Sequence, residues 1–308
     1  MGDIDLSRAL KEFFETILPE ENVRMDEPMD RHTTFRVGGP AKCFVTVDTR
    51  EQLSKVLSYL QRAGWDFFIL GNGSNLLVGD KGYRGVIVAL GADFSSVDIS
   101  ENRMTAGSGA LLGSMAKAAL EAQLTGLEFA AGIPGTLGGA VRMNAGAYGG
   151  EMKQVIESVE VMGMDGEILI LDNDTMEFGY RTSAIKNRPY VVLGATLKLA
   201  CGDKEVISET MRDLAQRRRD KQPLEFPSAG STFKRPEGHF AGKLIQDAGL
   251  SGRTCGGAVI SEKHCGFIVN KGGATAADVS KLISDIQEIV KEKFGVTLET
   301  EVIFLGDF

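Results

Sequence analysis

The stretch from Phe129 to Gly150, FAAGIPGTLGGAVRMNAGAYGG, decides how the chain is interpreted. Glycine weakens both helices and strands, so this stretch is predicted to be neither. It is also too apolar for a flexible linker, because Arg142 is its only charged side chain. Bare backbone N–H groups can hold phosphate oxygens or the edge of a flat ring. The alternative interpretation is a tightly packed turn region at a domain junction.

Length and composition are those of an ordinary soluble globular protein. The 308 residues, 43% hydrophobic and 25% charged, are enough for two or three domains with a sizeable core. The net charge of −8 argues against nucleic acid as a partner. No signal peptide and no membrane-spanning run is recognisable, so we expect a cytoplasmic protein without membrane association. The four cysteines are scattered, which predicts neither a disulfide framework nor a metal site.

Hydrophobic periodicity predicts a mixture of helices and strands. Helices are expected over residues 5–18 (with Leu6, Leu10, Phe13, Phe14 and Ile17 on one face), from the Thr49–Gln52 capping box to Gly64, over 111–124, from Asp203 to the basic run Arg217–Arg219, over 241–248, and after Thr275. Strands are expected at 41–47, 67–70, 86–90, 96–99, 103–106, 190–199 and 296–305, with a strand and turn over 33–40 and a hairpin around Asp165–Gly166.

Two further glycine turns, Gly71-Asn-Gly-Ser-Asn75 and Gly107-Ser-Gly109, each follow a predicted strand. Neither completes a Rossmann fingerprint, because Leu76 and Leu112 stand where a third glycine is needed. The first turn offers bare amides, two Asn side chains and a Ser hydroxyl, a set of neutral donors that suits a pyrophosphate. Together, the three glycine-rich segments favour a large dinucleotide such as FAD, which carries its own redox chemistry.

Three residues far apart in sequence are candidates for catalysis. Arg181 follows an aromatic residue and can pair bidentately with a carboxylate, although it can also be an ordinary surface arginine. Ser231 lies in a Gly-Ser-Thr turn that can aim its hydroxyl at a ligand, or is simply a turn serine. Glu301 shares a face of the predicted closing strand with apolar residues and is expected to be partly buried; the alternative is an exposed strand end.

Nine motifs carry a family resemblance, and they run from about residue 31 to the C-terminus. They are Thr33–Gly39, Gly71–Leu77, Ala131–Gly139, Met143–Tyr148, Tyr180–Arg181, Gly230–Lys234, Ala241–Ile245, Ser261–His264 and Glu301–Val302. In these motifs the chain closely resembles the UDP-N-acetylenolpyruvoylglucosamine reductases, in the shorter variant that lacks an extra tyrosine loop. That family belongs to the FAD enzymes typified by vanillyl-alcohol oxidase, which do not use a Rossmann fold.

The resemblance implies an α+β fold with three parts. Two are α+β FAD-binding subdomains of the vanillyl-alcohol-oxidase type, expected at residues 1–93, with the N-terminal helix, and at 94–202. The third is an α+β substrate-binding domain at 203–308, whose last strand returns to the active site.

The resemblance also implies the chemistry. NADPH reduces FAD, and flavin N5 passes a hydride to the enolpyruvyl ether of UDP-N-acetylglucosamine, giving UDP-N-acetylmuramate for peptidoglycan. Ser231 is expected to donate the proton, while Arg181 and Glu301 polarise the carboxylate and steady the enolate. A bare carboxylate at Glu301 would repel the enolate, so Glu301 is expected to be protonated or hydrogen-bonded. Serine is a weak acid, so Ser231 needs positive charge from Lys234 or Arg181.

The remaining ligand residues follow from the same motifs. FAD contacts are expected at Gly71, Asn72, Gly73, Ser74, Asn75, Leu76, Gly109, Gly132, Ile133, Pro134, Gly135, Thr136, Gly139, Asn144, Gly146 and Ala147, and substrate contacts at Tyr180 and Lys243. No metal and no obligate protein partner is inferred. Two other functions stay open at this point: an FAD oxidase of the same cofactor fold that acts on another alcohol, and a sugar-nucleotide-binding protein without flavin.

Overall fold

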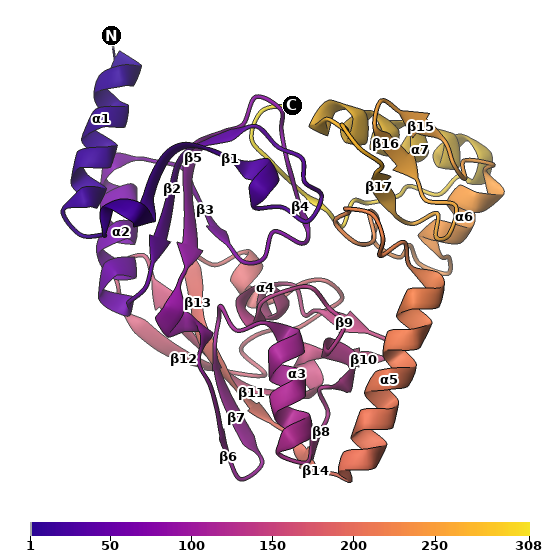
Figure 1. Cartoon of the computed structure of the whole chain (residues 1–308), viewed down its shortest axis with the longest axis horizontal. Coiled ribbons are helices and arrows are strands. Elements are labelled where there is room, and N and C mark those ends of the chain that lie inside the picture. The colour runs from indigo at the N-terminus through magenta and orange to yellow at the C-terminus, as the bar shows by residue number, and fades with distance from the viewer. Residues whose placement is uncertain (1) are drawn as a thin grey trace. The chain divides into compact units, whose positions relative to one another are not determined.

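The computed structural model describes the backbone of residues 2–308 and the side chains of residues 7–308. Its chain forms two compact units, each assembled from several segments. The first unit holds the segment up to Met25, Cys43–Gly71 and Gly85–Arg217; the second holds Asp26–Lys42, Asn72–Arg84 and Arg218–Phe308. Figure 1 labels their helices and strands. The three-part division at residues 93/94 and 202/203 stays a prediction.

One sheet, most of which belongs to the first unit, has four strands in the order β1-β2-β5-β3, with β3 parallel to β5. Its strands are β1 (Val23–Pro28), β2 (Pro40–Val47), β3 (Phe67–Leu70) and β5 (Tyr83–Leu90). Helices α1 (Gly2–Glu15) and α2 (Arg50–Ala63) lie beside it (Figure 1). Leu10 and Phe14 of α1 are fully buried in the same core as the apolar face of α2, as predicted. The prediction for Leu6 lies outside the described side chains.

Both ends of α2 follow the predicted signals. The hydroxyl of Thr49 accepts a hydrogen bond from the backbone N–H of Gln52, and the Gln52 side chain accepts one from the N–H of Thr49, which completes the capping box. Gly64 ends the helix with φ +68°, a left-handed conformation that glycine adopts without steric cost.

The second sheet of the first unit has five antiparallel strands in the order β12-β11-β13-β7-β6. They are β6 (Val97–Ser100), β7 (Arg103–Gly107), β11 (Ile156–Gly163), β12 (Ile168–Asp172) and β13 (Tyr190–Lys198). Side chains of α3 (Leu112–Glu121) and α4 (Leu137–Arg142) share one core with this sheet. Two short antiparallel pairs complete the unit: β8 (Leu124–Thr125) with β14 (Ala200–Cys201), and β9 (Gly146–Ala147) with β10 (Gly150–Glu151). The predicted hairpin is confirmed, with Gly166 at φ +85° in its turn.

Helix α5 (Lys204–Lys221) carries the boundary between the units near its C-terminal end. Among its residues only Ile207 is buried, so α5 is polar almost all round, as expected of a solvated connecting helix. Arg217 pairs with Asp213 at 2.8 Å with both side chains exposed, as is usual for basic residues at a solvated helix end.

The second unit is built on helix α7 (Ala276–Phe294). Its inward side chains pack with those of α6 (Ala241–Asp247) and of a three-stranded antiparallel sheet. The strands are β15 (Thr254–Cys255), β16 (Ala258–Ile260) and β17 (Ile268–Asn270), and a separate parallel pair joins β4 (Leu76–Val78) to β18 (Ile303–Leu305). Thr275 caps α7 through a box with Asp278. Of the six side chains that the spacing predicts to face inward, Ile289 is half-buried and the other five are buried: Val279, Leu282, Ile283, Ile286 and Val290.

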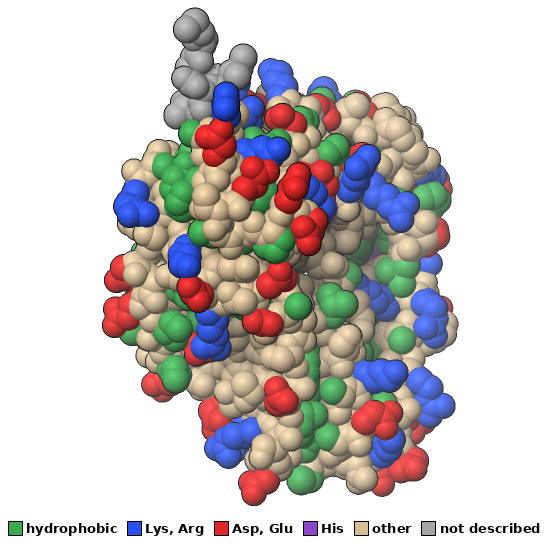
Figure 2. Space-filling model, turned by 60° about the vertical axis from the view of Figure 1, so that its left-hand side comes forward, with side chains coloured by type: hydrophobic (Ala, Val, Ile, Leu, Met, Phe, Trp, Pro, Cys, Tyr) green, Lys and Arg blue, Asp and Glu red, His purple; other side chains and the backbone are tan. Residues whose placement is uncertain are grey.

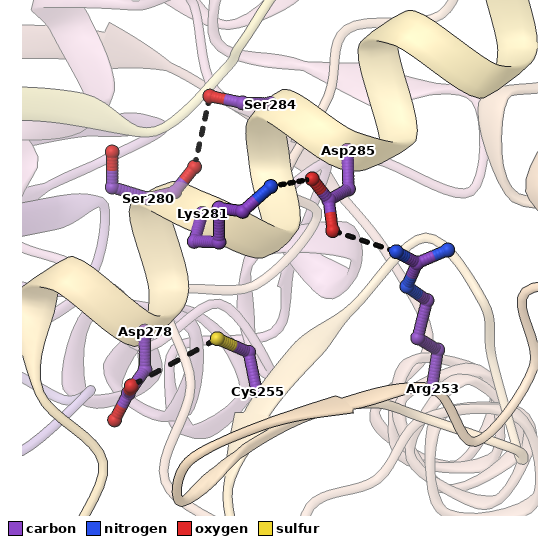
Figure 3. Close-up of polar contacts among 7 residues, drawn as sticks. All are labelled: Arg253, Cys255, Asp278, Ser280, Lys281, Ser284 and Asp285. Atoms are coloured by element: carbon purple, nitrogen blue, oxygen red, sulfur yellow. Dashed lines mark hydrogen bonds and ion pairs between the residues drawn. The ribbon is translucent and has the colours of Figure 1, made fainter.

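Polar contacts fasten α7 to the sheet beside it (Figure 3). The carboxylate of Asp285 accepts from Lys281 one turn earlier on α7 and, at 2.8 Å, from the guanidinium of Arg253. These contacts, led by the hydrogen bond from Lys281, hold the pKa of Asp285 below its ordinary value. Nearer the helix start, the Cys255 thiol lies 3.9 Å from the carboxylate of Asp278.

Four predicted elements are wrong in part. The helix predicted over 5–18 ends at Glu15. Residues 33–39 are not a strand, because Arg36 folds back on Thr33 in a turn and adopts φ +53°. The helix predicted over 111–124 ends at Glu121, because the next residues join the β8–β14 pair. The closing strand covers only Ile303–Leu305; residues 296–302 are irregular apart from one bridge, between Phe233 and Thr300.

The surface mixes charges of both signs. On the face shown in Figure 2, acidic and basic side chains alternate, and hydrophobic side chains are scattered between them. Within residues 2–308, no helix combines the length and the apolar character that crossing a bilayer requires.

Candidate active site

The glycine-rich stretch that decided the sequence interpretation contains a helix after all. Helix α4 occupies Leu137–Arg142, so the prediction that this stretch avoids helix is wrong there. Its first amides bond outside the helix: Leu137 N–H donates to Ala110 O at 2.9 Å, and Gly138 N–H donates to Ser108 O at 2.7 Å. Leu137 and Val141 are fully buried. Tertiary packing against the Gly107–Ala110 turn therefore overrides the low helix propensity of glycine.

Four predicted cofactor residues line one cavity of the first unit, with a volume of about 520 Å³. They are Gly71, Gly109, Thr136 and Gly139. Apolar side chains of β3 and β13 form much of the remaining wall. Two arginines, Arg142 and Arg188, also line the cavity, and none of its described lining residues is acidic. An apolar cavity with a few convergent polar groups is typical of a ligand site.

Two glycines of this cavity, Gly71 and Gly138, leave little room for a side chain. A Cβ at Gly71 would lie 2.7 Å from the Thr136 hydroxyl oxygen, and one at Gly138 would lie 3.0 Å from Cβ of Ser108. Gly107, at the start of the same turn, would place a Cβ only 2.2 Å from the carbonyl oxygen of Phe94. The backbone is packed tightly here, and the face that remains toward the cavity consists of main chain and small side chains.

Two cavity residues escaped the sequence analysis as ligand candidates. Ser108 is only 2% exposed, and its hydroxyl has no hydrogen-bond partner among the described residues. Arg142 donates to Ile185 O at 3.3 Å, and desolvation lowers its pKa below the ordinary arginine value. The sequence held a signal for each, since Ser108 stands between two glycines and Arg142 is the only charge in the glycine-rich stretch.

The other predicted cofactor residues are divided between the units. Gly132, Ile133, Pro134 and Gly135 precede α4, and Asn144, Gly146 and Ala147 follow it, all in the first unit; Asn72, Gly73, Ser74, Asn75 and Leu76 belong to the second. Gly73 is required by its turn, because its φ is +60° and a Cβ there would lie 2.0 Å from the carbonyl oxygen of His32.

Arg181 sits in a strained turn of the first unit. Its φ of +55° is rare for a residue with a side chain, and such strain is concentrated at functional sites. Gly179 and Thr182 bridge across the turn, and the Arg181 guanidinium donates to Gly146 O at 3.3 Å. The guanidinium also lies 5.3 Å from the ring centre of Tyr180, whose side chain is 55% exposed. The pair therefore presents a cation and an aromatic ring side by side.

The side chain of Asn144 stabilises this turn through hydrogen bonds. Its side-chain amide donates to Gly179 O and to the carboxylate of Glu151, each at 3.1 Å, and its oxygen accepts from Lys153 N–H at 2.9 Å. Because the side chain is 1% exposed and engaged on both ends, it ties the region after α4 to the turn that carries Arg181. Its role as an FAD contact stays a prediction.

In the second unit, Thr232 links the two remaining catalytic candidates. It follows Ser231 directly, is 1% exposed, and accepts the backbone N–H of Glu301 at 2.9 Å on its carbonyl oxygen. Its own N–H donates to Gly266 O at 2.8 Å, and its hydroxyl accepts from Ile268 N–H at 3.2 Å. Thr232 therefore connects Ser231, its neighbour in the chain, with Glu301, which lies 70 positions later in the sequence and is hydrogen-bonded to it.

Two more residues support this arrangement. The side-chain amide of Asn75 donates to Glu301 O at 3.0 Å, and Asn75 O accepts Ile303 N–H at the same distance. His264 accepts the Gly266 N–H on Nδ1 at 3.1 Å, and burial lowers its pKa, which keeps the imidazole neutral near pH 7. Neither supporting role was foreseen from the sequence.

Lys234, expected to assist Ser231, and Lys243, expected to contact the substrate, are both paired with acids. Lys234 forms a 2.9 Å ion pair with Glu299, and Lys243 contacts Asp247 one turn along α6. Glu301 itself is half-buried, but Ile303, expected to share a buried face with it, is 38% exposed. The face pattern predicted for a regular strand is wrong because residues 296–302 are irregular.

Comparison with known proteins decides the family. The chain is 54% identical to the UDP-N-acetylenolpyruvoylglucosamine reductase of Clostridioides difficile, covering 94% of this chain and 96% of that protein. It is 50% identical to the protein of the same name from Caldanaerobacter subterraneus subsp. tengcongensis, covering 98% and 100%.

The chain belongs to the UDP-N-acetylenolpyruvoylglucosamine reductase family.

Two family models match separate parts of the chain. The C-terminal-domain model of the UDP-N-acetylenolpyruvoylglucosamine reductases matches residues 222–305, and an FAD-binding-domain model matches residues 41–172. The crystal structure of the reductase from Thermus caldophilus superposes with a TM-score of 0.80 at 38% identity, covering 92% of this chain and 98% of that one. The predicted α+β fold with an FAD-binding part is confirmed.

The chain is an FAD-binding oxidoreductase of peptidoglycan precursor synthesis. The cavity of the first unit fits that cofactor on three counts. Glycines keep its wall bare, its charges are positive, and the Ser108 hydroxyl is buried without a partner. A dinucleotide presents an anionic pyrophosphate between apolar rings, so both the polar and the apolar lining have a counterpart.

Proposed function

We propose that the chain reduces the enolpyruvyl ether of UDP-N-acetylglucosamine to UDP-N-acetylmuramate, with NADPH as the source of electrons. When bound, FAD would supply the redox chemistry, the transfer of a hydride from NADPH to the vinyl group. The side chains of the protein are left with three tasks: to bind the carboxylate, to stabilise the charge that develops beside it, and to supply one proton.

Arg181 is proposed to bind the carboxylate of the enolpyruvyl group. Hydride arrival at the terminal carbon places negative charge on the neighbouring carbon, and that charge spreads into the carboxylate. A guanidinium fixed near this group stabilises the charge as it develops, and its fork of N–H donors matches two carboxylate oxygens. The strained φ of +55° and the bond to Gly146 O support this role, because they limit the directions in which the guanidinium can point.

Ser231 is proposed to donate the proton, and Glu301 to polarise the carboxylate with Arg181. The observation that carries this proposal is the position of Thr232, which follows Ser231 and accepts the backbone N–H of Glu301 at 2.9 Å. A general acid must be held within hydrogen-bond reach of the atom that it protonates. A hydroxyl on a segment fixed by three buried hydrogen bonds meets that demand better than one on a free loop.

Substrate contacts are proposed at Tyr180 and Lys243, and FAD contacts at the glycine turns. Tyr180 supports this by exposing its ring next to the Arg181 guanidinium. Lys243 lies on the exposed side of α6, where its contact with Asp247 involves two solvated side chains and is exchanged at little cost for a diphosphate.

The proposed function is tested by following NADPH absorbance with flavin-loaded protein. We expect NADPH oxidation to depend on added enolpyruvyl-UDP-N-acetylglucosamine and to yield UDP-N-acetylmuramate in equal amount. NADH in place of NADPH defines the nucleotide preference. Oxygen consumption with simple alcohols and no NADPH would instead identify an oxidase, and absence of any substrate-dependent oxidation would contradict the proposal.

A further inference from the structure

Ser108 is the buried serine whose hydroxyl lacks a partner in the first unit. The residue is 2% exposed, and its hydroxyl makes no hydrogen bond with any described residue. A buried hydroxyl in this state costs about 1–3 kcal/mol, and folded proteins keep few of them. Its backbone, by contrast, is fully used, since the N–H donates to Leu193 O at 2.9 Å and the carbonyl accepts from Gly138 at 2.7 Å.

The surroundings fix where this hydroxyl can find a partner. Ser108 lines the 520 Å³ cavity with Gly71, Gly138 and Gly139. The backbone around it cannot yield, because a Cβ at Gly107 or Gly109 would lie 2.2 or 3.1 Å from the carbonyl oxygen of Phe94. The Ser108 oxygen has almost no exposed surface in this rotamer, so it reaches a ligand in the cavity by rotation about χ1, which needs no backbone movement.

The charge of the cavity selects the ligand group. In a chain of net charge −8, the described lining of this cavity contains two arginines and no carboxylate. Arg188 is paired with Glu177 at 2.6 Å, whereas Arg142 contacts a carbonyl oxygen, that of Ile185, at 3.3 Å. Such a lining favours an anion, and a hydroxyl donor strengthens its binding through a charge-assisted hydrogen bond.

We propose that the Ser108 hydroxyl donates a hydrogen bond to a pyrophosphate oxygen of FAD and is a cofactor-binding residue of this chain. The proposal rests on the FAD site and assigns one further residue to it. The bond satisfies the hydroxyl only when the cofactor is bound. Ser108 therefore contributes to cofactor affinity and not to the stability of the cofactor-free protein.

The test uses Ser108→Ala in the full-length protein, with two readouts that need no turnover. In the first, cofactor-free protein is titrated with FAD and followed by flavin fluorescence. We expect the Kd to rise about 10-fold or more, since hydrogen bonds to charged groups contribute strongly to binding. Titrations with ADP, adenosine and riboflavin locate the loss: ADP should weaken by a similar factor, while adenosine and riboflavin should bind as to the unaltered protein.

The second readout is the thermal unfolding of the cofactor-free protein. Ser108→Ala should leave its Tm unchanged or raise it, because the substitution removes an unsatisfied group. The matched control is Ser183→Ala in the same unit: Ser183 is 3% exposed, but its hydroxyl donates to Arg142 O at 2.9 Å, so its loss should lower the Tm by about 2 °C. An unchanged FAD Kd, a Tm loss like that of the control, or weakening confined to adenosine or riboflavin would each overturn the assignment.

Discussion

The two units differ in how their functional polar groups are satisfied. In the first unit, the Ser108 hydroxyl lacks a partner in the described structure, and the glycines around it present bare backbone to a cavity. In the second unit, Thr232 uses its N–H, carbonyl and hydroxyl in hydrogen bonds, and Asn75 bonds the irregular segment that carries Glu301. The difference indicates that a ligand completes the first arrangement, whereas the protein alone completes the second. Substitutions in the two units should therefore have different effects on catalysis, FAD affinity and stability.

Arg181→Lys should give the largest loss among the substitutions that compare the units. Lysine keeps the charge but cannot pair bidentately with a carboxylate, so we expect reduction of the enolpyruvyl substrate to fall by about 10²-fold. Flavin reduction by NADPH should keep its rate. Stopped-flow spectroscopy of the two half-reactions measures both. Arg103→Lys, at an exposed pair with Glu157 in the same unit, is the matched control and should react normally.

Equal losses in the two half-reactions would contradict the role proposed for Arg181, because they would show that it acts on the flavin or on the fold. Wild-type reduction of the substrate would remove Arg181 from the proposed mechanism.

Thr232→Val should mainly lower the stability of the protein. Valine keeps the shape but leaves the Ile268 N–H without its acceptor, so the free energy of unfolding should fall by about 1–3 kcal/mol. FAD affinity should stay within twofold, since Thr232 is neither a proposed FAD contact nor part of the lining of the 520 Å³ cavity. Chemical denaturation and FAD titration measure the two quantities. Thr232→Ser retains the acceptor and should recover most of the hydrogen-bond loss; a Val and a Ser variant of equal stability would contradict the role given to the hydroxyl.

The Asp285 contacts predict a small effect that depends on pH. Lys281, with Arg253, lowers the folded-state pKa of Asp285, so these contacts stabilise the protein fully above the unfolded-state value of about 4. That contribution is lost as the pH falls through the lower folded-state pKa. The stability difference between wild type and Asp285→Asn should therefore shrink as the pH falls below about 4. Urea unfolding from pH 7 to pH 3 measures it.

The control for this titration is Glu51→Gln, at an exposed pair with Lys55 on α2. Its difference from wild type should be smaller at every pH, because both side chains are solvated. A pH-independent difference for Asp285→Asn would show that its charge does not matter.

Much of the fold was readable because local signals and tertiary packing agree. The Thr49 and Thr275 capping boxes, the Gly166 turn and the apolar face of α7 are set by residues close together in sequence, and all were predicted. Helix α4 was missed because its first amides bond to Ser108 and Ala110, which lie far outside any local window. The same holds for the irregular path before Ile303, where a backbone bond to Thr232 replaces a strand ladder.

The sequence predicted which residues are candidates for the site, but not which contacts they make. Motif resemblance selected Arg181, Ser231 and Glu301, and their chemical roles stay predictions. The hydrogen bonds of Asn144, Asn75 and His264 depend on where other backbone groups lie in the folded chain. The periodicity of the sequence does not predict those positions. Ser108 shows the limit most clearly, because a missing partner is visible only once all neighbours are placed.

The most direct test of the account is a single-turnover measurement on Ser231→Ala. The variant is loaded with FAD, reduced anaerobically with NADPH, and mixed with enolpyruvyl-UDP-N-acetylglucosamine while flavin absorbance is followed. The account predicts that reduction by NADPH proceeds at the wild-type rate, and that reoxidation by the sugar nucleotide slows by about 10²–10⁴-fold, the usual contribution of a general acid. Reoxidation at the wild-type rate would contradict it.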